Sequence, residues 1–209
     1  MEGRAKIEEA KRLFGRNFIG AEEIRRMAPE LGLQLPEEIP ELPYTLSEME
    51  SRAGNCILIL GAGRMHNGSR LTLLALRERF GTDPAAFEPC FYNQDWYLKE
   101  NFMQTGLENK WYLIDKEVND GSRAVVPAIL EKKLNFPTAV LCAFVFFANW
   151  FHSKEILWKN DFIWCSDTDH NGDRIYVGRY ADIDGINKNG FSIHRHLALR
   201  SWHAAVSVY

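Results

Sequence analysis

The stretch FIWCSDTDHNGDRIYVGRY, residues 162–180, decides the fold class of this chain of 209 residues. It holds the pair Asn171-Gly172 between two segments of alternating apolar and polar residues, a pattern that favours a tight β-hairpin. A second pair, Asn189-Gly190, follows. Four segments share the period of two that is typical of strands, namely 162–165, 175–180, 191–196 and 204–209. The sequence therefore predicts an antiparallel sheet in the last third of the chain.

Helical patterns dominate the part of the chain before that sheet. Thr45 and Glu48 form a capping box, in which each side chain accepts a backbone hydrogen bond from the other residue. A continuous apolar run, 56–60, is predicted to be a buried strand. Segments with helical apolar spacing are 4–14, 21–31, 70–80, 123–133 and 138–152. The expected fold is α+β, with residues 1–54 as a helical N-terminal extension and 55–209 as the main domain, packed together as one unit.

Composition and charge exclude some classes of function. Hydrophobic residues make up 46% and charged residues 25% of the chain, which is typical of a globular protein. The formal net charge of −3 gives no basic field for a phosphate backbone, so general nucleic-acid binding is not expected. The start of the sequence lacks the apolar segment of a secretion signal, and the longest apolar run, 138–150, is too short to span a bilayer. We expect a soluble, cytoplasmic protein with four free thiols and no cofactor.

A glycine-rich loop, 61–68, lies between a predicted strand and a predicted helix that Ser69 would cap. Nucleotide phosphates bind at such places, because free backbone N–H groups and the helix dipole point at the ligand. Gly63 and Gly68 have the spacing of a phosphate loop, but Ser69 stands where that loop has Lys. The dinucleotide motif fails as well, because His66 stands where it has Gly. A structural loop is the expected role, and nucleotide binding is the alternative.

The predicted hairpin loop resembles a calcium-binding loop. Oxygen-bearing side chains alternate along it, at Asp167, Asp169, Asn171 and Asp173. The twelfth position of the motif is Gly178, so the carboxylate that should bind calcium through both oxygens is missing. We expect a hairpin turn without a metal ion.

Three histidines in the predicted sheet suggest a second kind of metal site. His194 and His196 project from the same face of a strand, because alternate residues point the same way. His203 begins the next predicted strand. Three imidazoles can hold zinc or iron with one open position, so a metal-dependent enzyme is the alternative to a binding protein.

The same region is rich in the residue types that anchor binding sites, namely Trp, Tyr and Arg. Phe191 and Ile193 should face the core, so His194 and His196 should face outward, and Arg195 should need a buried partner. We expect a ligand-binding face on the last strands and their connections. Its predicted residues are Arg179, Tyr180, Asp182, His194, His196, Arg200, Trp202, His203 and Tyr209.

The motif WCSDTDHNGDRIYVGRY, residues 164–180, followed by NGF at 189–191, resembles a family of small uncharacterised bacterial proteins. Those proteins look like the C-type-lectin-like variable proteins of diversity-generating retroelements and, more distantly, like the formylglycine-generating-enzyme fold. FYNQDWY, residues 91–97, and WYLIDK, residues 111–116, resemble the middle section of the family. The paired catalytic cysteines of the formylglycine-generating enzyme are absent, which argues against that activity.

The resemblance implies a C-type-lectin-like fold whose last strands contact a ligand, over residues 179–184 and 191–209. It implies a receptor-type, non-catalytic protein that binds a protein or another macromolecular ligand. Whether the chain is a diversified retroelement product or a fixed relative is left open by one sequence.

Overall fold

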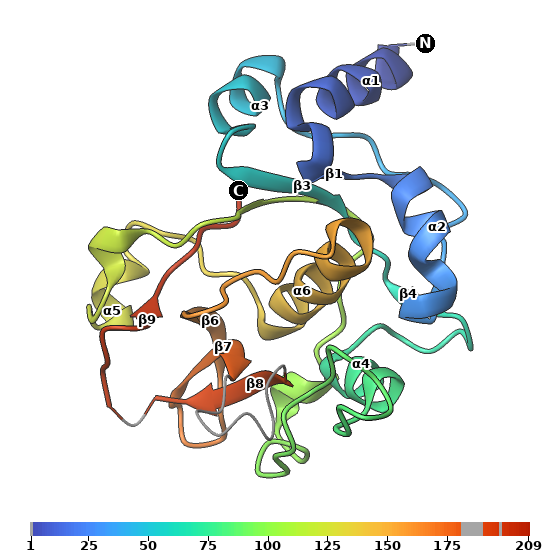
Figure 1. Ribbon diagram of the computed structural model, residues 1–209. Coiled ribbons are helices and arrows are strands. Elements are labelled where there is room, and N and C mark those ends of the chain that lie inside the picture. Colours follow the sequence, from blue (N-terminus) through green and yellow to red (C-terminus); the bar gives the residue numbers. More distant parts are fainter. Residues whose placement is uncertain (1, 181–189, 197) are drawn as a thin grey trace.

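The computed structural model describes residues 2–180, 190–196 and 198–209 (Figure 1). The fold is mixed α+β with largely antiparallel strands. The helices are α1 (Glu2–Phe14), α2 (Ala21–Leu31), α3 (Leu46–Arg52), α4 (Leu73–Phe80), α5 (Pro127–Leu130) and α6 (Ala139–Ser153), with 3-10 turns at Gly15–Asn17, Asn101–Gln104 and Asp120–Ser122. The strands are β1 (Phe18–Ile19), β2 (Leu33–Gln34), β3 (Cys56–Leu60), β4 (Arg64–Met65), β5 (Trp111–Asp115), β6 (Phe162–Thr168), β7 (Arg174–Tyr180), β8 (Gly190–Arg195) and β9 (His203–Ala204).

The C-terminal sheet has the strand order β8-β7-β6-β9. Strands β6, β7 and β8 are antiparallel, as the sequence predicts, and the Asn171-Gly172 pair lies in the turn between β6 and β7. The prediction of an antiparallel strand over 204–209 was wrong. Strand β9 has two residues and runs parallel to β6, with Phe162 opposite His203.

This difference follows from where β9 lies. Strands β8 and β9 occupy opposite edges of the sheet, so the chain between them must cross one face. Leu199, in that crossing segment, packs against a small cluster on the face that is turned away from α6. The cluster consists of Phe136, Trp164 and Ala205, and Leu130, Leu134 and Tyr176 also pack against it. Beyond β9 the chain leaves this sheet, and Val208 forms a bridge to Ile114 of β5. The local alternation in 204–209 could not reveal partners that are so distant in sequence.

Helix α6 fills the space between the C-terminal sheet and the rest of the molecule (Figure 1). Most of its residues are buried, as its continuous apolar sequence predicts. Thr138 caps it by accepting a hydrogen bond from the Leu141 N–H. Phe146 packs on Phe191 of β8, with ring centroids 5.2 Å apart. The inner face of the sheet is therefore a fixed part of the core.

Residues 1–54 contribute strands as well as helices. Phe18 and Ile19 pair in parallel with Leu58 and Ile59, so β1 extends the β3–β5 sheet. Helices α1 and α3 cover one side of that sheet, whereas α2 packs against α6 (Figure 1). The Thr45–Glu48 capping box forms as predicted.

Two predicted helices differ from the structure. Residues 123–133 contain only the short α5, which begins at Pro127. Helix α4 begins at Leu73 and is capped by Thr72, not by Ser69, because Ser69 and Arg70 belong to a hairpin with β4. Among the residues that the structure describes, no helix has the length and hydrophobicity required to cross a bilayer.

Candidate functional site

The outer face of the C-terminal sheet, turned away from α6, gathers aromatic and imidazole rings. The strand register explains this, because Trp164, Tyr176 and His194 lie directly opposite one another on β6, β7 and β8. Phe162 lies opposite His203 on β9. We call this surface the aromatic–histidine face, made of Phe162, Trp164, Tyr176, His194, His196 and His203.

The rings of this face alternate rather than cluster by type. Tyr176 stacks on His194, with centroids 5.2 Å apart and an interplanar angle of 18°, and its ring lies 4.4 Å from that of His203. Trp164 contacts His196 at 5.1 Å and His203 at 5.2 Å. Within the described residues, the nitrogens of the three histidines do not all lie within 4.8 Å of one another. The predicted three-histidine metal site is therefore not formed in this arrangement.

The two histidines nearest Tyr176 are held neutral by burial. Burial lowers the pKa of His194 to about 4. Burial first, and then electrostatic repulsion from His196, His194 and Arg200 when those groups are protonated, lowers the pKa of His203 to about 4. The Nδ1 atom of His203 accepts a hydrogen bond from the Arg200 N–H at 3.3 Å, so the proton of this imidazole sits on Nε2.

Two buried polar atoms of the aromatic–histidine face have no hydrogen-bond partner among the described residues. They are the indole Nε1 of Trp164 and Nε2 of His194. An unpaired buried polar group costs about 1–3 kcal/mol. Gln94 and Trp158 carry such atoms outside this face.

An exposed rim borders the face on the segment that crosses from β8 to β9. Trp202 is 46% exposed, and its ring lies 6.3 Å from that of His203. Arg200 is also exposed. The predicted residues His194, His196, Arg200, Trp202 and His203 are thus brought together.

Other predicted site residues lie elsewhere. Arg179 pairs with Phe191 in the register, which places it on the side of the sheet that faces α6. Tyr209 packs against β5 and α3 rather than on the sheet. Asp182 lies outside the described residues, and so does the side chain of Tyr180. Arg195, expected to need a buried partner, donates to Asp169 Oδ2 at 3.3 Å, and the Asp169 side chain is fully buried.

Sequence reasoning missed Trp164 and Tyr176, the two central rings. The sequence did contain the information. Both residues stand between apolar residues that face the core, and alternate residues of a strand point to opposite faces, so both should face outward as His194 does. The same alternation places Arg179 inward together with Ile175 and Val177.

Two of the three carboxylates in the calcium-like loop, those of Asp167 and Asp169, accept hydrogen bonds from the protein itself. Asp167 accepts a hydrogen bond from the Ala139 N–H at 2.6 Å, at the start of α6. Asp169 accepts from the backbone N–H groups of Asn171 and Asp173, both at 2.9 Å. Burial acts to raise the pKa of Asp169, but these hydrogen bonds outweigh burial and lower it. The loop is built as a hairpin turn stabilised by Asp169.

Glu100 joins this turn from a distant part of the chain. Its two carboxylate oxygens contact the backbone N–H and Nδ1 of His170, at 2.9 and 2.6 Å. Glu100, Asp169 and His170 bring their ligand-type atoms within 4.8 Å of one another. The carboxylates of Glu100 and Asp169 already accept hydrogen bonds from the hairpin turn, so this group of residues stabilises the turn.

The glycine loop has a packing role. A Cβ atom at Gly61 would lie 2.5 Å from the Glu108 carbonyl oxygen and 2.7 Å from the Tyr112 ring, so only glycine allows this approach. Because α4 begins at Leu73, well after the loop, its N-terminus is not placed as in a phosphate loop. Nucleotide binding of that kind is not supported.

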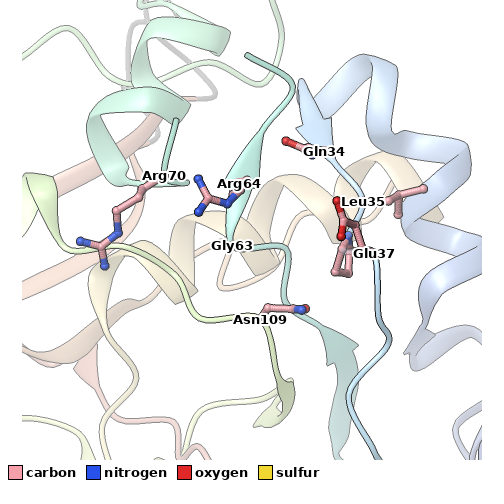
Figure 2. A pocket seen from close by; sticks show the side chains of 8 residues that line it. Gln34, Leu35, Glu37, Gly63, Arg64, Arg70 and Asn109 are labelled. Atoms are coloured by element: carbon pink, nitrogen blue, oxygen red, sulfur yellow. The ribbon is translucent and has the colours of Figure 1, made fainter. Parts of the chain in front are cut away.

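A groove of about 480 Å³ nevertheless lies beside this loop. Figure 2 shows Arg64 and Arg70 on one side of it and Gln34, Leu35 and Glu37 on the other, with Gly63 and Asn109 between them. Its volume is in the range of sites for small ligands.

Comparisons with known proteins identify no relative, since no family model, no curated protein and no solved structure matches the chain.

Proposed function

We propose that this chain is a receptor-type, non-catalytic binding protein, whose ligand contacts the aromatic–histidine face and its rim. One observation carries the proposal. Of the six tryptophans, all of them described, Trp202 alone is exposed, and it stands at the edge of this face beside Arg200. Trp and Arg are the residues that most often dominate the binding energy of protein interfaces.

The unpaired atoms beneath the rim support the same interpretation. Trp164 holds an unpaired N–H donor, and His194 Nε2 donates or accepts according to its tautomer; both atoms are buried beneath the rim. Both His194 and His203 are neutral at pH 7, so the face combines flat apolar rings with uncharged polar groups. Such a surface favours ligands that offer apolar area and hydroxyl or amide groups.

The face is less suited to metal chemistry. Tyr176 and Trp164 lie between the imidazoles, and a three-histidine centre needs its nitrogens to converge on one point. Binding is therefore the better supported function, and a metal-dependent enzyme is not favoured by any specific contact.

The resemblance of residues 160–209 to C-type-lectin-like variable proteins adds to the proposal. In that family the last strands and their connections contact the ligand, which agrees with the position of Trp202 and Arg200. A C-type-lectin-like fold and a retroelement origin are parts of this proposal. A reverse-transcriptase gene beside this one, with a near-copy of the 3′ coding region, would support the retroelement origin.

The decisive experiment compares two double variants in ligand capture, read out by cross-linking and mass spectrometry. Trp202→Ala with Arg200→Ala should lose the partners that the wild type retains. Leu46→Ala with Arg25→Ala is the matched control, because Leu46 in α3 is also 46% exposed, Arg25 in α2 is exposed, and neither belongs to the face or its rim. Equal capture by the wild type and the Trp202/Arg200 variant would contradict the proposal.

A further inference from the structure

The hairpin that follows Gly63 places two arginines directly opposite each other. Arg64 and Arg70 form an antiparallel bridge, and the Met65 N–H donates to the Ser69 carbonyl oxygen at 2.9 Å. Opposed residues of an antiparallel pair carry their side chains on one face, with Cβ atoms about 4.5–5.5 Å apart. The side chains of Arg64 and Arg70 therefore leave the hairpin on the same face, and both residues are exposed.

Neither guanidinium is neutralised within the described part of the chain. No carboxylate forms an ion pair with Arg64 or Arg70 there. Arg64 donates one hydrogen bond, from Nη1 to the Gly68 carbonyl oxygen at 2.8 Å. Arg70 lies over Gly106, where an added Cβ would fall 2.5 Å from its Nη2 atom. Like charges directly opposite each other destabilise a strand pair, and an anion between them would remove that cost.

The surroundings of the two arginines form a site of suitable size and polarity. They line the groove of about 480 Å³ together with the side-chain amides of Gln34 and Asn109. Glu37 lies on the opposite wall (Figure 2). The groove thus has the N–H donors of two guanidinium groups on one side and the carboxylate acceptor of Glu37 on the other.

We propose that this groove binds a small ligand through an anionic group, either a phosphate monoester or a carboxylate, held between Arg64 and Arg70. The planar guanidinium matches both groups, since it presents paired N–H donors to two oxygens. Glu37 then accepts from a hydroxyl or ammonium group on the same ligand, and it disfavours ligands of high negative charge. The site shares no residue with the aromatic–histidine face, so it is independent of the proposed function.

The test is a titration of the full chain with sodium phosphate and, separately, with sodium acetate at constant ionic strength. Binding is followed through the arginine side-chain N–H signals in ¹H–¹⁵N NMR spectra. The wild type should show saturable shifts with at least one anion. Tighter binding of phosphate would assign the ligand as a phosphate monoester, and tighter binding of acetate would assign it as a carboxylate.

Three variants decide whether the groove is responsible. Arg64→Gln and Arg70→Gln should each weaken binding about tenfold or more, since each removes charged hydrogen bonds. Arg25→Gln removes the same charge from an exposed position outside the groove and should bind as the wild type does. If Arg70→Gln fails to fold, because Arg70 packs over Gly106, Arg64→Gln decides alone.

Three results would overturn the proposal. They are the absence of a saturable shift with either anion, binding that survives both groove substitutions, and an equal loss of binding in Arg25→Gln.

Discussion

The guanidinium carbon of Arg52 lies 3.4 Å from the centre of the Tyr209 ring. The hydroxyl of the same tyrosine donates to Asp115 Oδ1 at 3.1 Å, and the hydroxyl of Tyr44 donates to its carbonyl oxygen at 2.7 Å. Groups from α3, β5 and the segment before α3 therefore converge on one residue. Tyr209, predicted to contact a ligand, has a stabilising role.

Tyr209→Ala should lower the free energy of unfolding by about 1–3 kcal/mol, because it removes a cation–π contact and a hydrogen bond to a carboxylate. Tyr209→Phe keeps the ring and should cost less than Tyr209→Ala. Urea denaturation measures both. A Tyr209→Ala protein as stable as the wild type would mean that these contacts contribute nothing.

Two tryptophans of the C-terminal region should respond in opposite ways to truncation. Trp164 is fully buried, so Trp164→Ala should cost about 3–5 kcal/mol. Trp202 is half-exposed, so Trp202→Ala should change stability by only about 0.5 kcal/mol. Thermal and urea unfolding of the two variants provide the comparison. A large loss with Trp202→Ala would assign Trp202 to the core and remove the best anchor of the proposed binding face.

Stability should fall in mild acid because of His194 and His203. Their pKa is about 4 in the folded protein, below the usual value of 6.5. The unfolded chain therefore binds more protons between pH 6.5 and 4. The free energy of unfolding should be unaffected by these groups above pH 7 and should decrease as the pH falls through that window. The loss from the buried His203 is at most roughly 3 kcal/mol, and that from the partly exposed His194 is smaller.

The double variant His194→Gln/His203→Gln isolates this effect. Its stability should vary less between pH 7 and pH 4.5 than that of the wild type, as measured by urea denaturation at each pH. The exposed His66 provides the control, and His66→Gln should keep the wild-type pH dependence. Equal slopes for the double variant and the wild type would contradict the assignment.

Asp169 should be essential to the hairpin between β6 and β7. Asp169→Ala removes the acceptor for two backbone N–H groups and the anion that pairs with Arg195, so it should cost about 1–3 kcal/mol. Addition of millimolar calcium should not raise the melting temperature of the wild type, because the carboxylate already accepts these bonds. A calcium-dependent rise that Asp169→Ala abolishes would establish a metal site instead.

Gly61 and Gly54 should differ sharply when replaced by alanine. Gly61→Ala places a methyl group against the Glu108 carbonyl oxygen and should destabilise the protein by about 1–3 kcal/mol or more. Gly54 has open space around it, so Gly54→Ala should be nearly neutral. Thermal unfolding distinguishes the two. Equal effects would show that the approach of residues 107–110 does not restrict this position.

Local sequence patterns predicted those elements whose stability depends on nearby residues. Helix α2 and strand β3 have the predicted bounds, and the Thr45–Glu48 box caps α3. Periodicity also anticipated that Arg195 would need a buried partner. Its identity, Asp169, could not be derived, because it depends on how the hairpin turn folds back on β8.

The elements that were missed depend on contacts between residues far apart in sequence. Nothing near β9 indicates that it runs parallel to β6, or that Val208 pairs with Ile114. The capping role of Thr72 was missed because Ser69 fits the same pattern of cap residues. Five of the residues predicted to form the binding face lie together, but alternation applied to β6 and β7 would have added Trp164 and Tyr176 and excluded Arg179.

The path of residues 203–209, which pair first with β6 and then with β5, has a consequence for the order of folding. Because the ribosome makes this segment after all other described strands, the edge of β5 that bridges Val208 stays unpaired while the preceding residues emerge. An unpaired strand edge is prone to associate with other chains. Pairings between residues about 90 positions apart, such as Ile114 with Val208, also raise the contact order and slow folding. Newly made chains should therefore pass through a stage in which they are prone to associate. Chaperones or a low protein concentration should then raise the yield of folded protein.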